Sequence, residues 1–323
     1  MIYYFCYDNA KPTGGNKITY RHVELLNQLG FSACIVHQKR DFRYDQFSHH
    51  PPVMAMEDLR LSASDFFVLP EDLGPALNRI APGINKIIFN QNAYSTFRGY
   101  QLFDSNRPPY LHADTAATLV VSEDNKRYLE TAFPGLSPVR IRISFRQDVF
   151  YCEDLSQKKM QLCFMTRKNP SDVVQVISQL RARGVLQGWR FVALQNATEE
   201  EVAATMKESA VFLSFGHPEG ISLSNIEAMA AGCYVVGYSG MGCREYFDPG
   251  YCREVPFGDI TQFVEQAEVV ARQYDFCRDD FAAHIKRSQA YAMRTFSPDH
   301  ETSDLLSFYL GLGLQPQEQL VNG

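Results

Sequence analysis

Two pairs of residues in this sequence have the types and positions expected of an anion-binding site. Arg167 and Lys168 lie just after the apolar segment 160–165 and just before a predicted helix. Two cations and the amides of a helix start could together clamp a diphosphate, although a solvated charge pair would look the same in sequence. Gly14 and Gly15 lie between the first predicted strand and the first predicted helix. A turn there lets backbone amides approach an anion, or simply connects the two elements.

Two glutamates with seven residues between them are the other candidates for chemistry. Glu227 lies inside the apolar segment 226–231, and it needs a partner because burying an unpaired charge is costly. That partner could be the start of its own helix, since Ser224 and Glu227 have the spacing of a capping box. Glu219 precedes this helix and could equally be a solvated loop acid.

The segment 211–246 contains the elements that would position these two carboxylates. An apolar run, VFLSF, predicts a buried strand, and the loop that contains Glu219 follows it. A helix then ends at Gly232, a typical C-terminal glycine, and CYVVGY predicts the next strand. Loops at the carboxyl ends of such strands bind ligands in open α/β sheets, so this segment predicts a ligand site.

The first half of the chain predicts a second α/β unit. Residues 2–8 and 33–37 predict strands on either side of a helix at 17–29, which favours a parallel sheet. The glycine pair is not a dinucleotide fingerprint, because no third glycine follows at the required spacing. Residues 38–55 predict a loop, and the irregular stretch 144–159 predicts the linker between two domains.

A loop after the predicted strand 86–90 contains further polar candidates. Asn92 and Tyr94 offer an amide and a hydroxyl group, which suit hydrogen bonding to sugar hydroxyls. Ordinary turn chemistry explains an asparagine at such a position equally well.

Composition narrows the class of protein. The length of 323 residues fits two domains, and the net charge of −6 argues against a nucleic-acid-binding protein. None of the eight cysteines forms a CxxC pair, so we interpret them as core residues in a reducing compartment rather than zinc ligands. No signal peptide and no run of ~20 apolar residues is present, which predicts a cytoplasmic protein, with peripheral contact to the inner face of the membrane left open.

The stretch PEGISLSNIEAMAAG resembles the donor-site signature of retaining GT-B glycosyltransferases of family four, the glycosyl transferases group 1. Three positions depart from that signature: Ile221 replaces a phenylalanine, Ser222 a glycine and Tyr234 a proline. Ser222 is the most consequential departure, because the backbone there normally passes close to the donor's sugar and phosphates. The matching positions are Glu219, Gly220, Leu223, Glu227, Ala228, Met229, Ala230, Gly232, Val235 and Val236.

The resemblance implies an α/β protein with the GT-B fold, in which two Rossmann-like domains face a central cleft. The N-terminal acceptor domain would comprise residues 1–145, with the C-terminal helix, 299–323, crossing back to it. The C-terminal domain, residues 146–298, would bind the nucleotide-sugar donor.

The resemblance also implies a role for each candidate residue. Glu219 would stabilise positive charge on the sugar ring, and Glu227 would bind the two ribose hydroxyls. Arg167, Lys168 and nearby amides would stabilise the negative charge on the departing diphosphate. The other donor-site positions would be Gly14, Gly15, Gly220, Ile221, Ser222, Leu223, Ser224 and Asn196, the last of them beside the nucleotide base.

The implied reaction is transfer of a sugar from a nucleotide-diphosphate donor to a hydroxyl acceptor, a saccharide or lipid-linked saccharide, with retention at the anomeric carbon. Such an enzyme would serve polysaccharide biosynthesis. The departing phosphate can accept the acceptor's proton, so we expect no metal and no cofactor. Three alternatives remain: a nucleotide-sugar epimerase, a phosphorylase, for which no cofactor lysine is identifiable, and a non-catalytic nucleotide-sugar-binding or scaffold protein. The sequence does not predict the oligomeric state.

Overall fold

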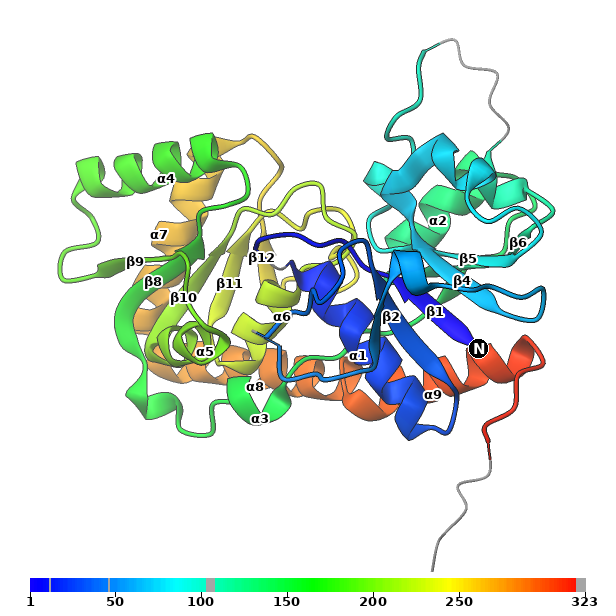
Figure 1. Ribbon diagram of the computed structural model, residues 1–323. Helices are drawn as coiled ribbons and strands as arrows, with labels where there is room; N and C mark the ends of the chain where they lie inside the picture. Colours follow the sequence, from blue (N-terminus) through cyan, green and yellow to red (C-terminus); the bar gives the residue numbers. More distant parts are fainter. Residues whose placement is uncertain (12, 46, 103–107, 318–323) are drawn as a thin grey trace, which may run out of the picture. The chain divides into compact units, whose positions relative to one another are not determined.

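The computed structural model describes residues 1–11, 13–45, 47–102 and 108–317, and it divides into two compact units (Figure 1). The first unit comprises Met1–Ile143 and the segment that begins at Asp299. The second unit comprises Ser144–Pro298.

The first unit is built on a parallel sheet with the strand order β3-β2-β1-β4-β5-β6-β7. Most residues of its central strands are buried, as expected for a parallel sheet covered on both faces. The strands are β1 (Ile2–Phe5), β2 (Ala33–His37), β3 (Val53–Ala55), β4 (Phe66–Pro70), β5 (Asn85–Asn90), β6 (Thr115–Val120) and β7 (Val139–Arg140). The chain moves outward from β1 through β2 to β3 and then returns to β4 on the other side of β1, so the strand order reverses between β1 and β4.

The helices of the first unit are α1 (Gly14–Gln28), α2 (Glu123–Ala132) and α9 (Pro298–Gly311), with short 3-10 helices η1 (Met56–Asp58), η2 (Glu71–Arg79), η3 (Ala93–Ser95) and η4 (Pro109–Leu111). The predicted loop at 38–55 is wrong at its end, because β3 pairs there with β2. The prediction that the last helix returns to the first unit is confirmed. Tyr309 on α9 lies 2.9 Å from the Tyr4 hydroxyl, and Asp304 forms a 2.6 Å ion pair with Arg142.

The second unit is built on a parallel sheet with the strand order β12-β11-β10-β8-β9. The strands are β8 (Lys159–Met165), β9 (Arg190–Leu194), β10 (Ser209–Ser214), β11 (Tyr234–Gly237) and β12 (Cys252–Glu254). The helices are α3 (Gln147–Phe150), η5 (Leu155–Gln157), α4 (Pro170–Arg183), α5 (Glu199–Glu208), α6 (Leu223–Ala230), α7 (Ile260–Phe276) and α8 (Arg278–Thr295).

The crossovers of the second unit change direction at one point. From β8 the chain moves to the edge strand β9, and from β9 it returns past β8 to β10, β11 and β12. Since parallel crossovers are right-handed, α4 and α5 must cover opposite faces of the sheet, and Figure 1 shows α4 beside α7, away from α5 and α6. The strand order therefore reverses between β8 and β10, the place where open α/β sheets bind ligands.

Candidate active site

The loops after β8 and β10 bring two of the predicted catalytic side chains together. The Nζ atom of Lys168 lies 3.1 Å from the Oε1 atom of Glu219. The two side chains keep 35% and 19% of their surface exposed, so a bound molecule could reach both. A cation and a carboxylate thus lie side by side at the reversal point of the sheet, where one could contact a phosphate and the other a sugar.

The backbone around Glu219 is held by the loop that follows β11. The Glu219 amide donates to the Gly240 carbonyl at 2.7 Å, and the Gly242 amide donates to the Glu219 carbonyl at 3.0 Å. A Cβ atom on Gly242 would lie 1.7 Å from the Gly220 carbonyl oxygen. The two loops therefore pack backbone against backbone, which only glycine permits at position 242.

Asn169 holds the loop after β8 against the loop after β10, a role that sequence reasoning missed. Its side-chain amide donates to the carbonyls of Phe215 at 2.7 Å and His217 at 3.1 Å. Its backbone has φ 44°, a left-handed conformation that asparagine tolerates better than most residues. Asn169 thus fixes the backbone beside Lys168. An asparagine before a proline at a helix start was the available signal.

Arg167 differs from its neighbour. It is exposed, and no described residue forms a hydrogen bond or an ion pair with it. Its guanidinium could accept a phosphate in bidentate fashion. A solvated arginine would look the same, so its predicted role stays a prediction.

The start of α6 differs from the capping box considered for Ser224 and Glu227. The N-cap residue is Ser222, without a side-chain cap bond, and Ser224 lies inside the first turn, so that alternative is wrong. The Glu227 residue is only 9% exposed. Glu227 therefore lies buried in the second turn of a helix that begins at the reversal point.

The amides at this helix start are not equally available. The Ser222 amide, which we expected to face the donor phosphates, donates to the Cys243 Sγ atom at 3.1 Å. The amides of Leu223 and Ser224 belong to the first turn, which has no intrahelical acceptors, and no described residue accepts from them. The anion-binding amides of this helix would therefore be those of Leu223 and Ser224.

The serine at position 222 is compatible with the local backbone. Its φ of −107° is an ordinary extended value, so the glycine of the family signature is not needed for conformation. The Ser222 hydroxyl lies 3.1 Å from the Ser224 hydroxyl, and its carbonyl accepts from Tyr246 at 3.3 Å. Of its signature neighbours, Gly220 is buried and Ile221 is half-buried.

The glycine pair of the first unit lies inside α1, which corrects the prediction of a turn before the helix. Thr13 is the N-cap and forms a capping box with Asn16, so Gly14 and Gly15 make up the first turn. A Cβ atom on Gly15 would lie 3.1 Å from the Gln91 side-chain oxygen. The pair therefore presents helix-start amides, as an anion site would require.

Asn92 and Tyr94 support their own loop. The Asn92 side chain accepts from the Tyr94 amide at 3.2 Å, and the Tyr94 hydroxyl donates to Asp124 at 2.8 Å. The buried Glu71 carboxyl accepts from the amides of Gln91 and Asn92, and burial raises its pKa to about 7. The suggested role of Asn92 and Tyr94 in acceptor binding stays a prediction.

Asn196 and His217 lie on two loops of the second unit. Asn196 is exposed in the loop after the edge strand β9 with φ 51°, one strand away from Lys168. His217, beside Glu219, stacks on Phe257 with ring centroids 3.9 Å apart, and burial lowers its pKa. Sequence reasoning did not single out this stacked pair.

Over the described ranges, no three His, Cys, Asp or Glu side chains are grouped to hold a metal ion, and no helix is long and apolar enough to cross a membrane.

Known proteins resemble this chain in sequence and in fold. Residues 151–273 match the profile of the family described as glycosyl transferases group 1. An alpha-1,6-glucosyltransferase of Actinobacillus pleuropneumoniae is 28% identical over 86% of this chain and 83% of that protein. The sucrose-phosphate synthase structure from Thermosynechococcus elongatus has a TM-score of 0.71 and 14% identity over 97% of this chain and 98% of that one. The HepE structure from Anabaena, in complex with UDP and glucose, has a TM-score of 0.61 and 14% identity over 97% and 99%.

The likeness to solved structures defines the class of fold. Two parallel α/β units, with a last helix that returns to the first unit, constitute the GT-B fold of the glycosyltransferases. Within that fold, the second unit is similar to the glycosyl transferases group 1, and most of the chain is similar to a glucosyltransferase.

Proposed function

We propose that this protein transfers a hexose, with retention and without a metal, from a nucleotide-diphosphate sugar to a hydroxyl group of a saccharide or lipid-linked saccharide. The observation that carries the proposal is the Lys168–Glu219 pair at the strand-order reversal, since Glu219 lies on the loop that leads into the first turn of α6. A cation and helix-start amides suit a departing diphosphate, and a carboxylate suits an electron-poor sugar ring.

The reaction exchanges one bond at the anomeric carbon for another. The bond between that carbon and the diphosphate oxygen breaks, and a bond to the acceptor oxygen forms on the same face of the ring. The acceptor's proton moves to the departing phosphate oxygen, so no separate base is required. Lys168, Arg167 and the amides of Leu223 and Ser224 stabilise the developing negative charge, while Glu219 stabilises the sugar ring.

The relatives support a uridine nucleotide and a glucosyl group. One relative is named an alpha-1,6-glucosyltransferase, and the HepE structure contains UDP and glucose. UDP-glucose has an α-linked sugar, so an α-linked product would require retention. Glu227, buried in α6, then holds the two ribose hydroxyls of the donor.

The test is an assay of purified protein with UDP-glucose and a panel of saccharide acceptors. Proton NMR of the product should show the small anomeric coupling of an α-linkage, and Glu219→Gln should greatly reduce UDP release. A β-linked product would refute retention. A new nucleotide sugar formed without an acceptor would indicate an epimerase, and tight UDP binding without turnover for any sugar would indicate a non-catalytic protein.

A further inference from the structure

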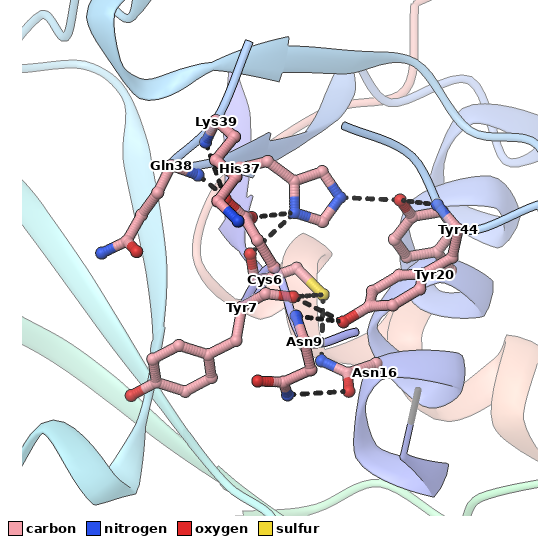
Figure 2. Close-up of polar contacts among 10 residues, drawn as sticks. Cys6, Tyr7, Asn9, Asn16, Tyr20, His37, Gln38, Lys39 and Tyr44 are labelled. Carbon is pink, nitrogen blue, oxygen red and sulfur yellow. Dashed lines mark hydrogen bonds and ion pairs between the residues drawn. The ribbon is translucent and has the colours of Figure 1, made fainter. Parts of the chain in front are cut away.

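A buried polar network lies at the carboxyl ends of β1 and β2 (Figure 2). His37 is the last residue of β2 and is fully buried, and the Asp8 side chain is 4% exposed. An imidazole and a carboxylate are costly to bury unless their polar atoms are bonded. Such a pair therefore needs a physical explanation.

The network is a directional chain of hydrogen bonds. The Tyr44 amide donates to the Tyr20 hydroxyl at 3.2 Å, and that hydroxyl lies 2.7 Å from the His37 Nε2 atom. The Nδ1 atom of His37 lies 2.8 Å from the Cys6 carbonyl and 2.9 Å from the Asp8 carboxylate. Because that carbonyl can only accept, Nδ1 carries the proton and Nε2 accepts from Tyr20. Burial lowers the pKa of His37, which agrees with a neutral ring at pH 7.

The chain does not perform chemistry on a substrate. Tyr20 and His37 are both 0% exposed, so no ligand can reach either hydroxyl or ring. An Asp-His-Tyr arrangement without access to solvent can only orient its neighbours.

The network holds the backbone that runs from β1 towards Gly14 and Gly15. The Asp8 carboxylate accepts from the amides of Gln38 at 3.2 Å and Lys39 at 2.7 Å, which ties it to the end of β2. The Tyr44 hydroxyl donates to the Tyr7 carbonyl at 2.7 Å and accepts from the Asn9 amide at 2.9 Å.

The capping residues of α1 join the same network. The Asn16 side-chain oxygen accepts from the Thr13 amide at 3.0 Å and hydroxyl at 2.7 Å, and its amide contacts the Cys6 Sγ atom at 3.3 Å. The network thus continues from the end of β2 to the first turn of α1, which contains Gly14 and Gly15.

We propose that His37 is a positioning residue, which with Tyr20 and Asp8 holds the described backbone at 7–9 and 13–16 so that the amides of the glycine pair are preorganised for the anionic part of the donor. This inference rests on the proposed function, because it takes the anion to be the donor diphosphate. Amides that are already held in position bind an anionic group without a further ordering cost, which raises the affinity for the donor. Loss of the network should therefore weaken donor use more than it weakens the fold.

The test compares two variants that each remove one buried hydroxyl of the first unit. Tyr20→Phe breaks the bond to His37, whereas the matched control Tyr4→Phe breaks the equally buried bond to Tyr309. We expect Tyr20→Phe to raise the KM for UDP-glucose about tenfold, a loss of the size of one hydrogen bond, with a smaller change in kcat. Tyr4→Phe should leave the KM unchanged, although both variants lower the melting temperature by similar amounts.

A second test compares the conservative variant His37→Asn with His37→Ala. His37→Asn retains a side-chain amide that can donate to the Cys6 carbonyl, so it should recover part of the donor affinity lost in His37→Ala. Amide hydrogen exchange of residues 7–9 and 13–16 should accelerate in Tyr20→Phe and not in Tyr4→Phe.

The possible results separate the inference from the function on which it rests. If the wild type transfers glucose but both tyrosine variants share its KM, the positioning role is refuted. If the wild type neither binds UDP nor transfers a sugar, the proposed function fails. In that case, amide hydrogen exchange in Tyr20→Phe and Tyr4→Phe still decides whether the network holds this backbone. Equal exchange rates in the two variants would refute that role as well.

Discussion

Glu71 makes the stability of the first unit depend on pH in a direction that can be worked out from the structure. The residue is 6% exposed at the end of β4, and its carboxyl accepts from the amides of Gln91 and Asn92. Burial is the largest influence and raises the pKa of Glu71 from 4.5 to about 7. A carboxyl with a raised pKa favours the folded state while it is protonated. Its contribution is fully present below pH 4.5 and is lost as the pH rises towards 7 and beyond.

The size of the effect follows from the shift. One pKa unit corresponds to 1.36 kcal/mol, so the rise to about 7 amounts to roughly 3 kcal/mol of unfolding free energy lost between pH 4.5 and 8. The substitution Glu71→Gln removes the ionisation while it keeps the size of the side chain. The difference in stability between wild type and Glu71→Gln should therefore shift by about 3 kcal/mol across this range, to the disadvantage of the wild type at high pH.

Scanning calorimetry at several pH values between 4.5 and 8 would measure this difference. Calorimetry is preferred because the single tryptophan, Trp189, lies in the second unit and would not report on the first. Glu130→Gln, an exposed change on α2, controls for the loss of one charge. A difference between wild type and Glu71→Gln that stays constant with pH would refute the assignment of a raised pKa to Glu71.

Three further predictions concern substitutions in the second unit. Gly242→Ala should reduce turnover and lower the melting temperature, because its Cβ would lie 1.7 Å from the Gly220 carbonyl oxygen. The control Gly311→Ala lies in open space at the end of α9, so it should leave the melting temperature unchanged or raise it. Lys158→Ala should cost more than about 3 kcal/mol in urea unfolding, because the buried Nζ donates to three carbonyl oxygens that would lose their donor. Arg167→Ala should lower kcat by roughly ten- to a thousandfold with an unchanged melting temperature, and unchanged turnover would remove this residue from the site.

The larger elements of the fold could be predicted because their signals are local. The predicted helix at 17–29 and the predicted strand at 33–37 correspond to α1 and β2 within a few residues, since each has a clear apolar pattern. The strand β3 was missed because it has three residues, too few for a recognisable alternation. Gly14 and Gly15 were placed outside α1 because glycine is a poor helix former, whereas the capping box of Thr13 with Asn16 starts the helix before them.

The site could be predicted in its residue types but not in its contacts. The resemblance pointed to Glu219 and Lys168, but nothing in the sequence shows that they pair, because they follow different strands and meet only through the strand order. The bond from the Ser222 amide to the Cys243 sulfur was equally unpredictable, since cysteine is a weak acceptor that patterns do not identify. The role of Asn169 depends on carbonyls from another loop, and sequence periodicity contains no information about them.

The measurement that tests the central claim most directly is the stability of the second unit with UDP, GDP, dTDP or ADP, in wild type and in Glu227→Ala. Trp189 fluorescence reports on this unit, because the residue is buried there against Tyr274. A diphosphate at about a hundred times its dissociation constant should add roughly 2.7 kcal/mol. We predict that UDP stabilises the wild type and has a much smaller effect on Glu227→Ala. No stabilisation by any of the four, or equal stabilisation of both proteins, would contradict a nucleotide site built on α6.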